Sequence, residues 1–174
     1  MATLIKERRI VADNWHLLER GPKGELPEVP ARGEVIVPLA LWLARREELL
    51  ARAETGTLGA WIDANEGPEA LAPDVRRFPL IAVNFPRFGD GRGYSIARLL
   101  RERYGYKGEL RAIGDVLHDH LFFMVQCGFD AFALREDQDA QEALSVFDTF
   151  SDGYQTSVLR PVPLFRRRLA TGKS

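Results

Sequence analysis

The chain has 174 residues, of which 45% are hydrophobic and 28% are charged, a composition typical of a folded globular domain. Its 24 basic and 25 acidic residues leave a formal net charge of −1, so no basic field is present that would recruit nucleic acid. The single cysteine, Cys127, excludes an internal disulfide and a cysteine cage for zinc or an iron–sulfur cluster. No apolar leader and no run of about 18 apolar residues is present, so the sequence predicts a cytoplasmic protein without a membrane segment.

The first half of the chain predicts short strands that alternate with helices. A small hairpin is expected in the first 20 residues, with strands at 10–11 and 15–18 on either side of Asp13-Asn14. A strand at 35–37 precedes a helix that begins after Pro38 and continues to residue 53. The next strand, 58–62, is followed by a weak helix that Pro73 shortens.

The stretch Leu80–Ser95, LIAVNFPRFGDGRGYS, is the most informative part of the sequence. Its apolar start at 80–83 predicts a buried strand, and the glycine-rich charged segment that follows predicts a loop before a helix that begins near Ser95. Further strands are predicted at 110–113 and 129–134, with a helix from Asp115 to Gly128 between them and another after Asp137.

This order of elements predicts an α/β fold, because five successive β-α units require parallel strands and right-handed crossovers. Residues 1–152 are expected to form a single domain with a mainly parallel sheet. The sheet is either an open twisted sheet with helices on both faces or an incomplete (β/α) barrel with helices outside, since a full barrel needs about 250 residues. Residues 153–174 form a basic tail that contains proline and arginine, and its motif RPVPLFRRR is either a docking segment or a solvated terminus.

Four predicted strands end in a polar residue: Asp63, Asn84, Asp115 and Arg135. The carboxyl ends of parallel strands lie on one rim of the sheet, so these side chains are expected to line one pocket. The alternative is that strand ends are polar because loops are solvated.

The glycine-rich loop is the candidate anion site of this rim. Arg87, Asp90 and Arg92 alternate with glycines there, and Ser95 stands at the expected helix start, an arrangement suited to sulfate, phosphate or carboxylate. The loop is neither a dinucleotide fingerprint nor a P-loop, because Tyr94 and the residues after it break both patterns. A tight turn with a solvated charge cluster is the alternative.

Candidate acid/base residues are Asp115 and His118, which with Asp119 have the spacing of one helical face. The alternative is an N-capping Asp115 beside a surface histidine, and no metal site is assigned. Cys127 lies among phenylalanines and is predicted to be a buried, unreactive thiol.

The long stretch FPLIAVNFPRFGDGRGYSIARLLRERYGYKGELRAIGDVLHDHLFFMVQCGFDAFAL, together with VIVPLALW near Val35, resembles the bacterial family of unknown function DUF934. Members are described as oxidoreductases or accessory proteins of sulfite reduction, and are commonly encoded beside the sulfite reductase haemoprotein and the sulfonucleotide reductase. The resemblance therefore implies a place in sulfate assimilation and cysteine biosynthesis, with one of these reductases as a partner. The sequence itself contains no nicotinamide, flavin, haem or iron–sulfur motif, so no cofactor is expected.

Two functions are compatible with these observations. One is an accessory protein of assimilatory sulfite reduction that binds a small anion or a reductase at the rim, as a monomer or a homo-oligomer. The other is an enzyme of sulfur metabolism that acts on an anionic substrate, with the acid/base residue at the same rim.

Overall fold

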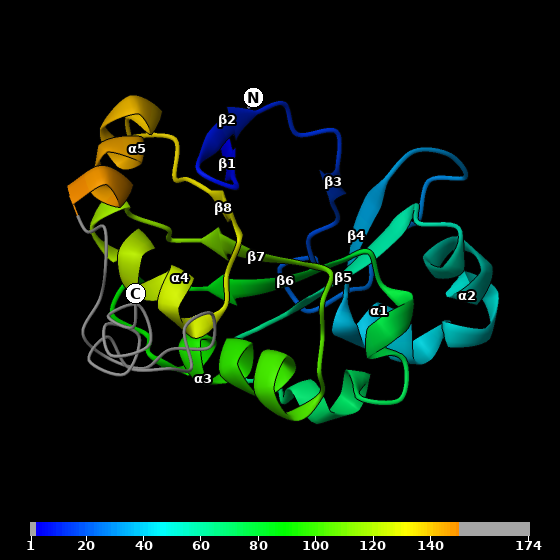
Figure 1. The fold of residues 1–174 in the computed structure, drawn as a ribbon. Helices are drawn as coiled ribbons and strands as arrows, with labels where there is room; N and C mark the ends of the chain where they lie inside the picture. Colours follow the sequence, from blue (N-terminus) through cyan, green and yellow to red (C-terminus); the bar gives the residue numbers. More distant parts are fainter. Residues whose placement is uncertain (1–2, 150–174) are drawn as a thin grey trace, which may run out of the picture.

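The computed structural model describes residues 3–149, which form one eight-stranded sheet with helices packed against it (Figure 1). The strand order is β2-β1-β8-β7-β6-β5-β4-β3, in which β3 to β8 are parallel and β1 runs antiparallel to β2 and β8. The strands are β1 (Leu4–Lys6), β2 (Arg9–Val11), β3 (His16–Leu17), β4 (Val35–Pro38), β5 (Leu58–Ile62), β6 (Leu80–Phe85), β7 (Glu109–Gly114) and β8 (Ala131–Ala133).

The sheet is curled into a half barrel with its helices on the outer face. Strands β3 to β8 follow one another in space as they do in sequence, so every right-handed crossover places its helix on the same side of the sheet. Figure 1 shows most of the helices below the sheet, the last helix (orange) at its upper left, and the N-terminal segment above it. The predicted α/β fold with a mainly parallel sheet is confirmed, and of its two arrangements the incomplete barrel is the one observed.

The N-terminal hairpin differs from the prediction. It is formed by β1 and β2, whose two-residue turn Glu7-Arg8 has positive φ angles of 50° and 62°. Two residues with positive φ make the type I′ geometry whose twist matches a hairpin. Residues 15–18 belong instead to the opposite edge of the sheet, where β3 pairs in parallel with β4.

Between β2 and β3, residues 12–15 cross the concave face of the half barrel; we call them the crossing segment. Asp13 of this segment accepts two hydrogen bonds, of 3.0 and 2.9 Å, from Nη1 of Arg111 on β7. Arg111 is only 2% exposed, and a buried charge is costly unless it is paired. Ion pairs with Asp13 and Glu109 neutralise it on the concave face. Just beyond the segment, Nε1 of Trp61 donates to the carbonyl oxygen of Leu18 at 3.0 Å.

The apolar core lies on both faces of the sheet. The outer face and the helices share the larger cluster, in which alternate residues of β5 (Leu58, Ala60 and Ile62) point toward the helices. The concave face has a smaller cluster of Ile36, Trp61, Leu80, Ala82 and Ile113, against which Trp15, Leu17 and Ala133 pack. The N-terminal segment therefore covers part of the face that a complete barrel would enclose.

The crossover from β4 to β6 contains short helices. The helix expected from residue 39 to 53 is divided at Arg45 into α1 (Leu39–Ala44) and α2 (Arg46–Glu54), because Arg45 has φ −126° and ψ 28°. After β5, the weak helix is two 3₁₀ turns, Pro68–Leu71 and Val75–Arg77, on either side of Pro73.

The helix after β6 begins earlier than predicted, at Arg92, and ends in a π-helical turn: α3 spans Arg92–Arg98 and the turn spans Leu99–Arg103. Arg101 leaves this turn toward the neighbouring loops, where its guanidinium donates to the carbonyl oxygens of Tyr106, Gly108 and Gly128, each at 2.9 Å. It is also 3.3 Å from Oδ2 of Asp130. Arg101 therefore connects three segments that the sheet alone does not join.

The last helices are α4 (Leu121–Cys127), preceded by a 3₁₀ turn at His118–His120, and α5 (Ala140–Thr149). Gly128 ends α4 with φ 113°, as predicted from its position. Asp139 rather than Asp137 caps α5, because its carboxylate accepts from the backbone N–H groups of residues 141 and 142. Cys127 is buried as predicted, and burial raises the pKa of its thiol.

The predicted domain boundary at residue 152 and the tail 153–174 lie outside the described residues. None of the helices between residues 3 and 149 has the length and apolar character that crossing a bilayer requires.

Candidate functional site

The carboxyl ends of β5, β6, β7 and β8 form the rim on which Asp63, Asn84, Asp115 and Arg135 were expected to gather. The structure places these residues in two pairs. Nδ2 of Asn84 donates to Oδ1 of Asp63 at 3.0 Å, and Nη1 of Arg135 donates to Oδ1 of Asp115 at 2.6 Å. The rim therefore consists of an Asp63–Asn84 half and an Asp115–Arg135 half.

The Asp63–Asn84 half borders a cavity of about 280 Å³ on the concave face. Arg20 lies on its other side, with its guanidinium 4.9 Å from the ring centroid of Trp61 and Nη2 2.5 Å from Oε1 of Glu66. The Nε atom of Arg20 is buried and has no hydrogen-bond partner within residues 3–149. The cavity thus has a cation, an indole and a carboxylate on its walls.

A second cavity, of about 520 Å³, adjoins the first and extends along the concave face toward Arg135 and Glu136. The two cavities share Leu17, Glu19 and Ile113, and we call them together the concave groove. Their combined position, inside a (β/α) half barrel and at the carboxyl ends of its strands, is where (β/α) barrels place their active sites.

The glycine-rich loop lies on the outer side of the rim, and its charges are partly paired with one another. Arg92 donates to both carboxylate oxygens of Asp90, and the Arg92 guanidinium lowers the pKa of Asp90 to about 2. The backbone N–H of Arg92 also donates to Oδ1 of Asp90, at 3.1 Å, which explains why α3 begins here and not near Ser95. Ser95 is exposed on the first turns of that helix.

Arg87 differs from the other arginines of the rim. Its side chain is exposed and has no hydrogen-bond or ion-pair partner in the described part of the chain. Arg92 and Arg135 are each held by carboxylates, and Asp137 and Asp115 raise the pKa of Arg135. Arg87 is therefore the rim cation whose charge is available to another molecule.

Next to Arg87 the loop exposes an aromatic side chain. Phe88 is 55% exposed, its backbone N–H donates to Oδ2 of Asp115 at 2.8 Å, and its ring stacks on that of His120 with centroids 6.1 Å apart. One helical turn beyond His120, Phe123 is 44% exposed and contacts Tyr94, with a centroid distance of 4.8 Å. We call Phe88, Tyr94, His120 and Phe123 the aromatic patch.

The three glycines of the loop have different roles. A Cβ atom on Gly89 or Gly91 would meet no other atom within 4 Å, whereas a Cβ on Gly93 would lie 2.6 Å from the ring of Phe85. Gly93 therefore allows α3 to pack closely against β6, a role that nothing in the local sequence distinguishes from those of Gly89 and Gly91.

The prediction that Asp115 shares a helical face with His118 and Asp119 is wrong. The chain is helical only from His118, so the Asp115 carboxylate turns toward Phe88 and Arg135. His118 lies elsewhere, with Nδ1 2.7 Å from Oε1 of Gln138 and Nε2 3.0 Å from Oδ1 of Asp119. Within residues 3–149, no three His, Cys, Asp or Glu side chains gather in a manner that would hold a metal ion.

The sequence model described as "Bacterial protein of unknown function (DUF934)" matches residues 59–165, more than half of the chain. The chain belongs to the DUF934 family. No curated protein and no solved structure matches it.

The match places the whole rim of this DUF934 protein inside the family region. Both halves of the rim, the aromatic patch and strands β6 to β8 lie within residues 59–165, as does β5 except for its first residue, Leu58. Glu19 and Arg20, which complete the concave groove, precede it. Sequence analysis missed these two residues and Trp61 because it expected the N-terminal segment to form a separate hairpin.

Proposed function

We propose that this DUF934 protein is an accessory protein of assimilatory sulfite reduction that binds a reductase partner through Arg87 and the aromatic patch. The pathway is the one that the family resemblance implies. The observation that supports a partner, rather than a small anion, is the pairing of the rim: Arg92 and Arg135 are neutralised by carboxylates, while Arg87 and Phe88 are exposed side by side.

Arginine and aromatic side chains are the residues that contribute most to protein–protein binding. An unpaired arginine beside an exposed phenylalanine fits a partner surface that offers a carboxylate next to an apolar pocket. The ring of Phe88 rests on His120, and its backbone is held by Asp115, so the side chain is positioned before any partner arrives. Such positioning reduces the conformational entropy that binding would otherwise cost.

The test is binding of the purified protein to the purified sulfite reductase haemoprotein and to the sulfonucleotide reductase, measured by calorimetry. The double substitution Arg87→Ala with Phe88→Ala should weaken binding by about 30-fold or more, the loss typical of one hot-spot residue. The matched control is Arg32→Ala with Leu43→Ala, which removes an exposed arginine and an exposed leucine that belong neither to the aromatic patch nor to the concave groove. Equal affinity of the two double variants would overturn the proposal, as would the absence of binding to either reductase.

A second candidate is an enzyme of sulfur metabolism that acts on an anionic substrate, with Asp115 or His118 as the acid/base residue. The observation that favours it is the concave groove, because its position matches that of (β/α) active sites. Asp115 and His118 do not line the groove themselves; Asp115 is connected to it through Arg135, which does. Growth of a deletion strain on sulfate separates the two candidates. Asp115 also holds the backbone of Phe88, so His118→Asn is the variant that separates the candidates. It should abolish growth if catalysis by this residue is required, whereas loss of growth in the Arg87→Ala, Phe88→Ala protein but not in His118→Asn favours partner binding.

A further inference from the structure

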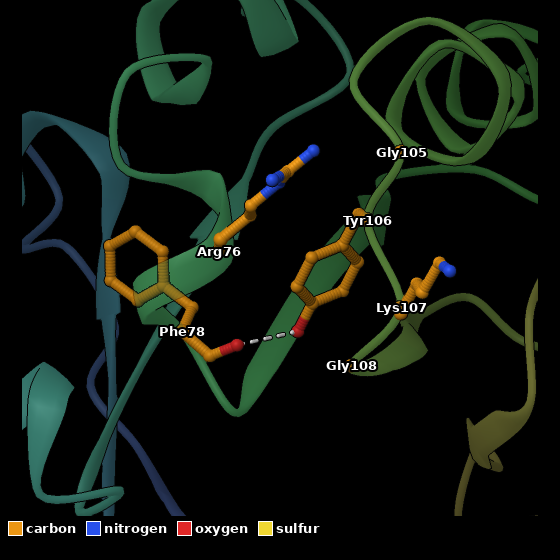
Figure 2. Close-up of a pocket in the computed structure, with 6 residues that line it drawn as sticks. All are labelled: Arg76, Phe78, Gly105, Tyr106, Lys107 and Gly108. Atoms are coloured by element: carbon orange, nitrogen blue, oxygen red, sulfur yellow. Dashed lines mark hydrogen bonds between the residues drawn. The ribbon is translucent and has the colours of Figure 1, made fainter.

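A cavity of about 390 Å³ lies at the opposite end of the sheet from the rim, where β6 and β7 begin (Figure 2). It is lined by Arg76, Phe78, Gly105, Tyr106, Lys107 and Gly108. Neither the rim nor the concave groove includes any of these residues. Its volume is within the range of sites that hold small molecules.

The base of this cavity is rigid. The Tyr106 hydroxyl lies within hydrogen-bond distance of two carbonyl oxygens, 3.1 Å from that of Phe78, as drawn in Figure 2, and 3.2 Å from that of Glu109. Phe78 and Tyr106 are only 3% and 2% exposed, and the Phe78 ring packs on Trp42 in the core. A Cβ on Gly108 would collide with the Tyr106 hydroxyl, which explains the glycine at this position.

Arg101 also holds the loop Gly105–Gly108, which lines this cavity. Its Nη1 donates to the carbonyl oxygens of Tyr106 and Gly108, both at 2.9 Å. Two carbonyl groups of the Gly105–Gly108 loop, those of Tyr106 and Gly108, are therefore held by Arg101. The backbone of this loop is thus held in place before any ligand binds.

The charge of the cavity is positive and unpaired. Arg76 and Lys107 are exposed, and neither makes a hydrogen bond or an ion pair with any residue from 3 to 149. In the view of Figure 2 their side chains stand on either side of the Tyr106 ring. None of the six lining residues is acidic.

The nearby acidic side chains are already paired with other cations. Arg77 binds Glu54 and Asp74, and Asp130 binds Arg101. Glu109 binds Lys6 and Arg111. Two spare positive charges therefore remain at the mouth of a preformed cavity, and the chemistry that complements them is an anion of two charges.

We infer that this cavity binds a small organic molecule through a phosphate or sulfate group held between Arg76 and Lys107. The cavity is larger than the anionic group needs, so it leaves room for the organic part of the ligand. The site lies at the far end of the strands from the rim, so its ligand and the proposed reductase partner do not compete for the same residues.

The test is titration of the ¹⁵N-labelled protein with phenyl phosphate and, separately, phenyl sulfate, at constant ionic strength maintained with sodium chloride. Saturable shifts of the amide signals of Gly105, Lys107 and Gly108 are expected. Because each charge-assisted hydrogen bond is worth more than the free energy of a tenfold change in affinity, Arg76→Gln with Lys107→Gln should weaken binding by about 100-fold. The single variant Arg76→Gln should weaken it by about tenfold.

The matched control is Lys23→Gln with Arg32→Gln, which removes the same net charge from exposed positions outside the cavity. This protein should bind as the unmodified chain does. The tighter of the two probes identifies the group that the site prefers, and a phosphate ester, with its second charge, should be the tighter one. Shifts that do not saturate, shifts that persist in the Arg76→Gln, Lys107→Gln protein, or shifts at Gly89–Gly93 instead would each overturn the assignment. None of these results depends on whether a reductase binds at the aromatic patch.

Discussion

Replacement of Arg101 by alanine should be among the most destabilising single substitutions in this protein. The side chain is 10% exposed, and it donates to three carbonyl oxygens at 2.9 Å and approaches Asp130 at 3.3 Å. A hydrogen bond contributes about 1 kcal/mol net, or about 1.5–3 kcal/mol when the donor is charged, whereas the ion pair with Asp130, which is 38% exposed, adds little. Because these contributions are not additive, we expect a loss of about 3–4 kcal/mol in the free energy of unfolding.

The loss can be measured by urea unfolding, followed by tryptophan fluorescence and circular dichroism. In a chain of this length, it corresponds to a melting temperature lower by about 10 °C. Arg101→Lys should recover little of the stability, because a lysine ammonium cannot reach the three carbonyl oxygens as the guanidinium does. The matched control is Arg103→Ala on the same helical turn, whose exposed side chain contacts only the Tyr104 ring in the described structure, and it should change stability by less than about 0.5 kcal/mol. A loss below about 1 kcal/mol for Arg101→Ala would refute the inference that this side chain connects the three segments.

Two further predictions concern the glycine-rich loop. Gly93→Ala should destabilise the protein by about 1–3 kcal/mol, because the added methyl group collides with the Phe85 ring, whereas Gly89→Ala should be near neutral; equal melting temperatures for the two variants would contradict the packing role of Gly93. The Asp90 carboxyl should titrate with a pKa of about 2, observed by NMR of its carboxyl carbon, because Arg92 stabilises the charged form. A lowered folded-state pKa means that this stabilisation is complete above the ordinary pKa near about 4 and is lost as the pH falls toward 2. In Arg92→Gln the pKa of Asp90 should rise toward its ordinary value, and an unchanged titration would show that the ion pair does not form in solution.

Much of the fold follows from the spacing of apolar residues. Runs such as 58–62 and 80–83 are buried on both faces, as strands between two layers of side chains must be, and the structure confirms them with small changes at the ends. The right-handed crossover rule then restricts the topology to two arrangements. The choice between them depends on which strands become neighbours, a property of long-range packing that no local pattern contains.

The position of the N-terminal segment and the pairing of the rim residues could not be predicted from local sequence patterns. Trp15 and Leu17 have the alternation of a hairpin strand, yet they pack on the concave face, because Ile36, Trp61 and Ile113 offer an apolar surface there. At the rim, the sequence places Asp63, Asn84, Asp115 and Arg135 at the ends of strands, but it does not show which of them pair with one another. Two arginines in one loop look alike in sequence, and only the structure shows that Asp90 forms an ion pair with Arg92 and that Arg87 forms none within residues 3–149.

The crossing segment has a consequence for the shape of the whole sheet. It connects β2 and β3, which occupy opposite edges of an eight-stranded order. In a flat sheet these edges would be about 34 Å apart, from seven steps of about 4.8 Å each. The five residue steps from Val11 to His16 span at most about 18 Å when fully extended. The crossing segment is therefore too short to join the two edges of a flat sheet, so it requires the sheet to be curved. Its length limits how far apart the edges, and hence the walls of the concave groove, can lie. Insertion of glycines into the crossing segment would remove this limit on the curvature of the sheet, and the affinity of a ligand that binds in the groove would change with it.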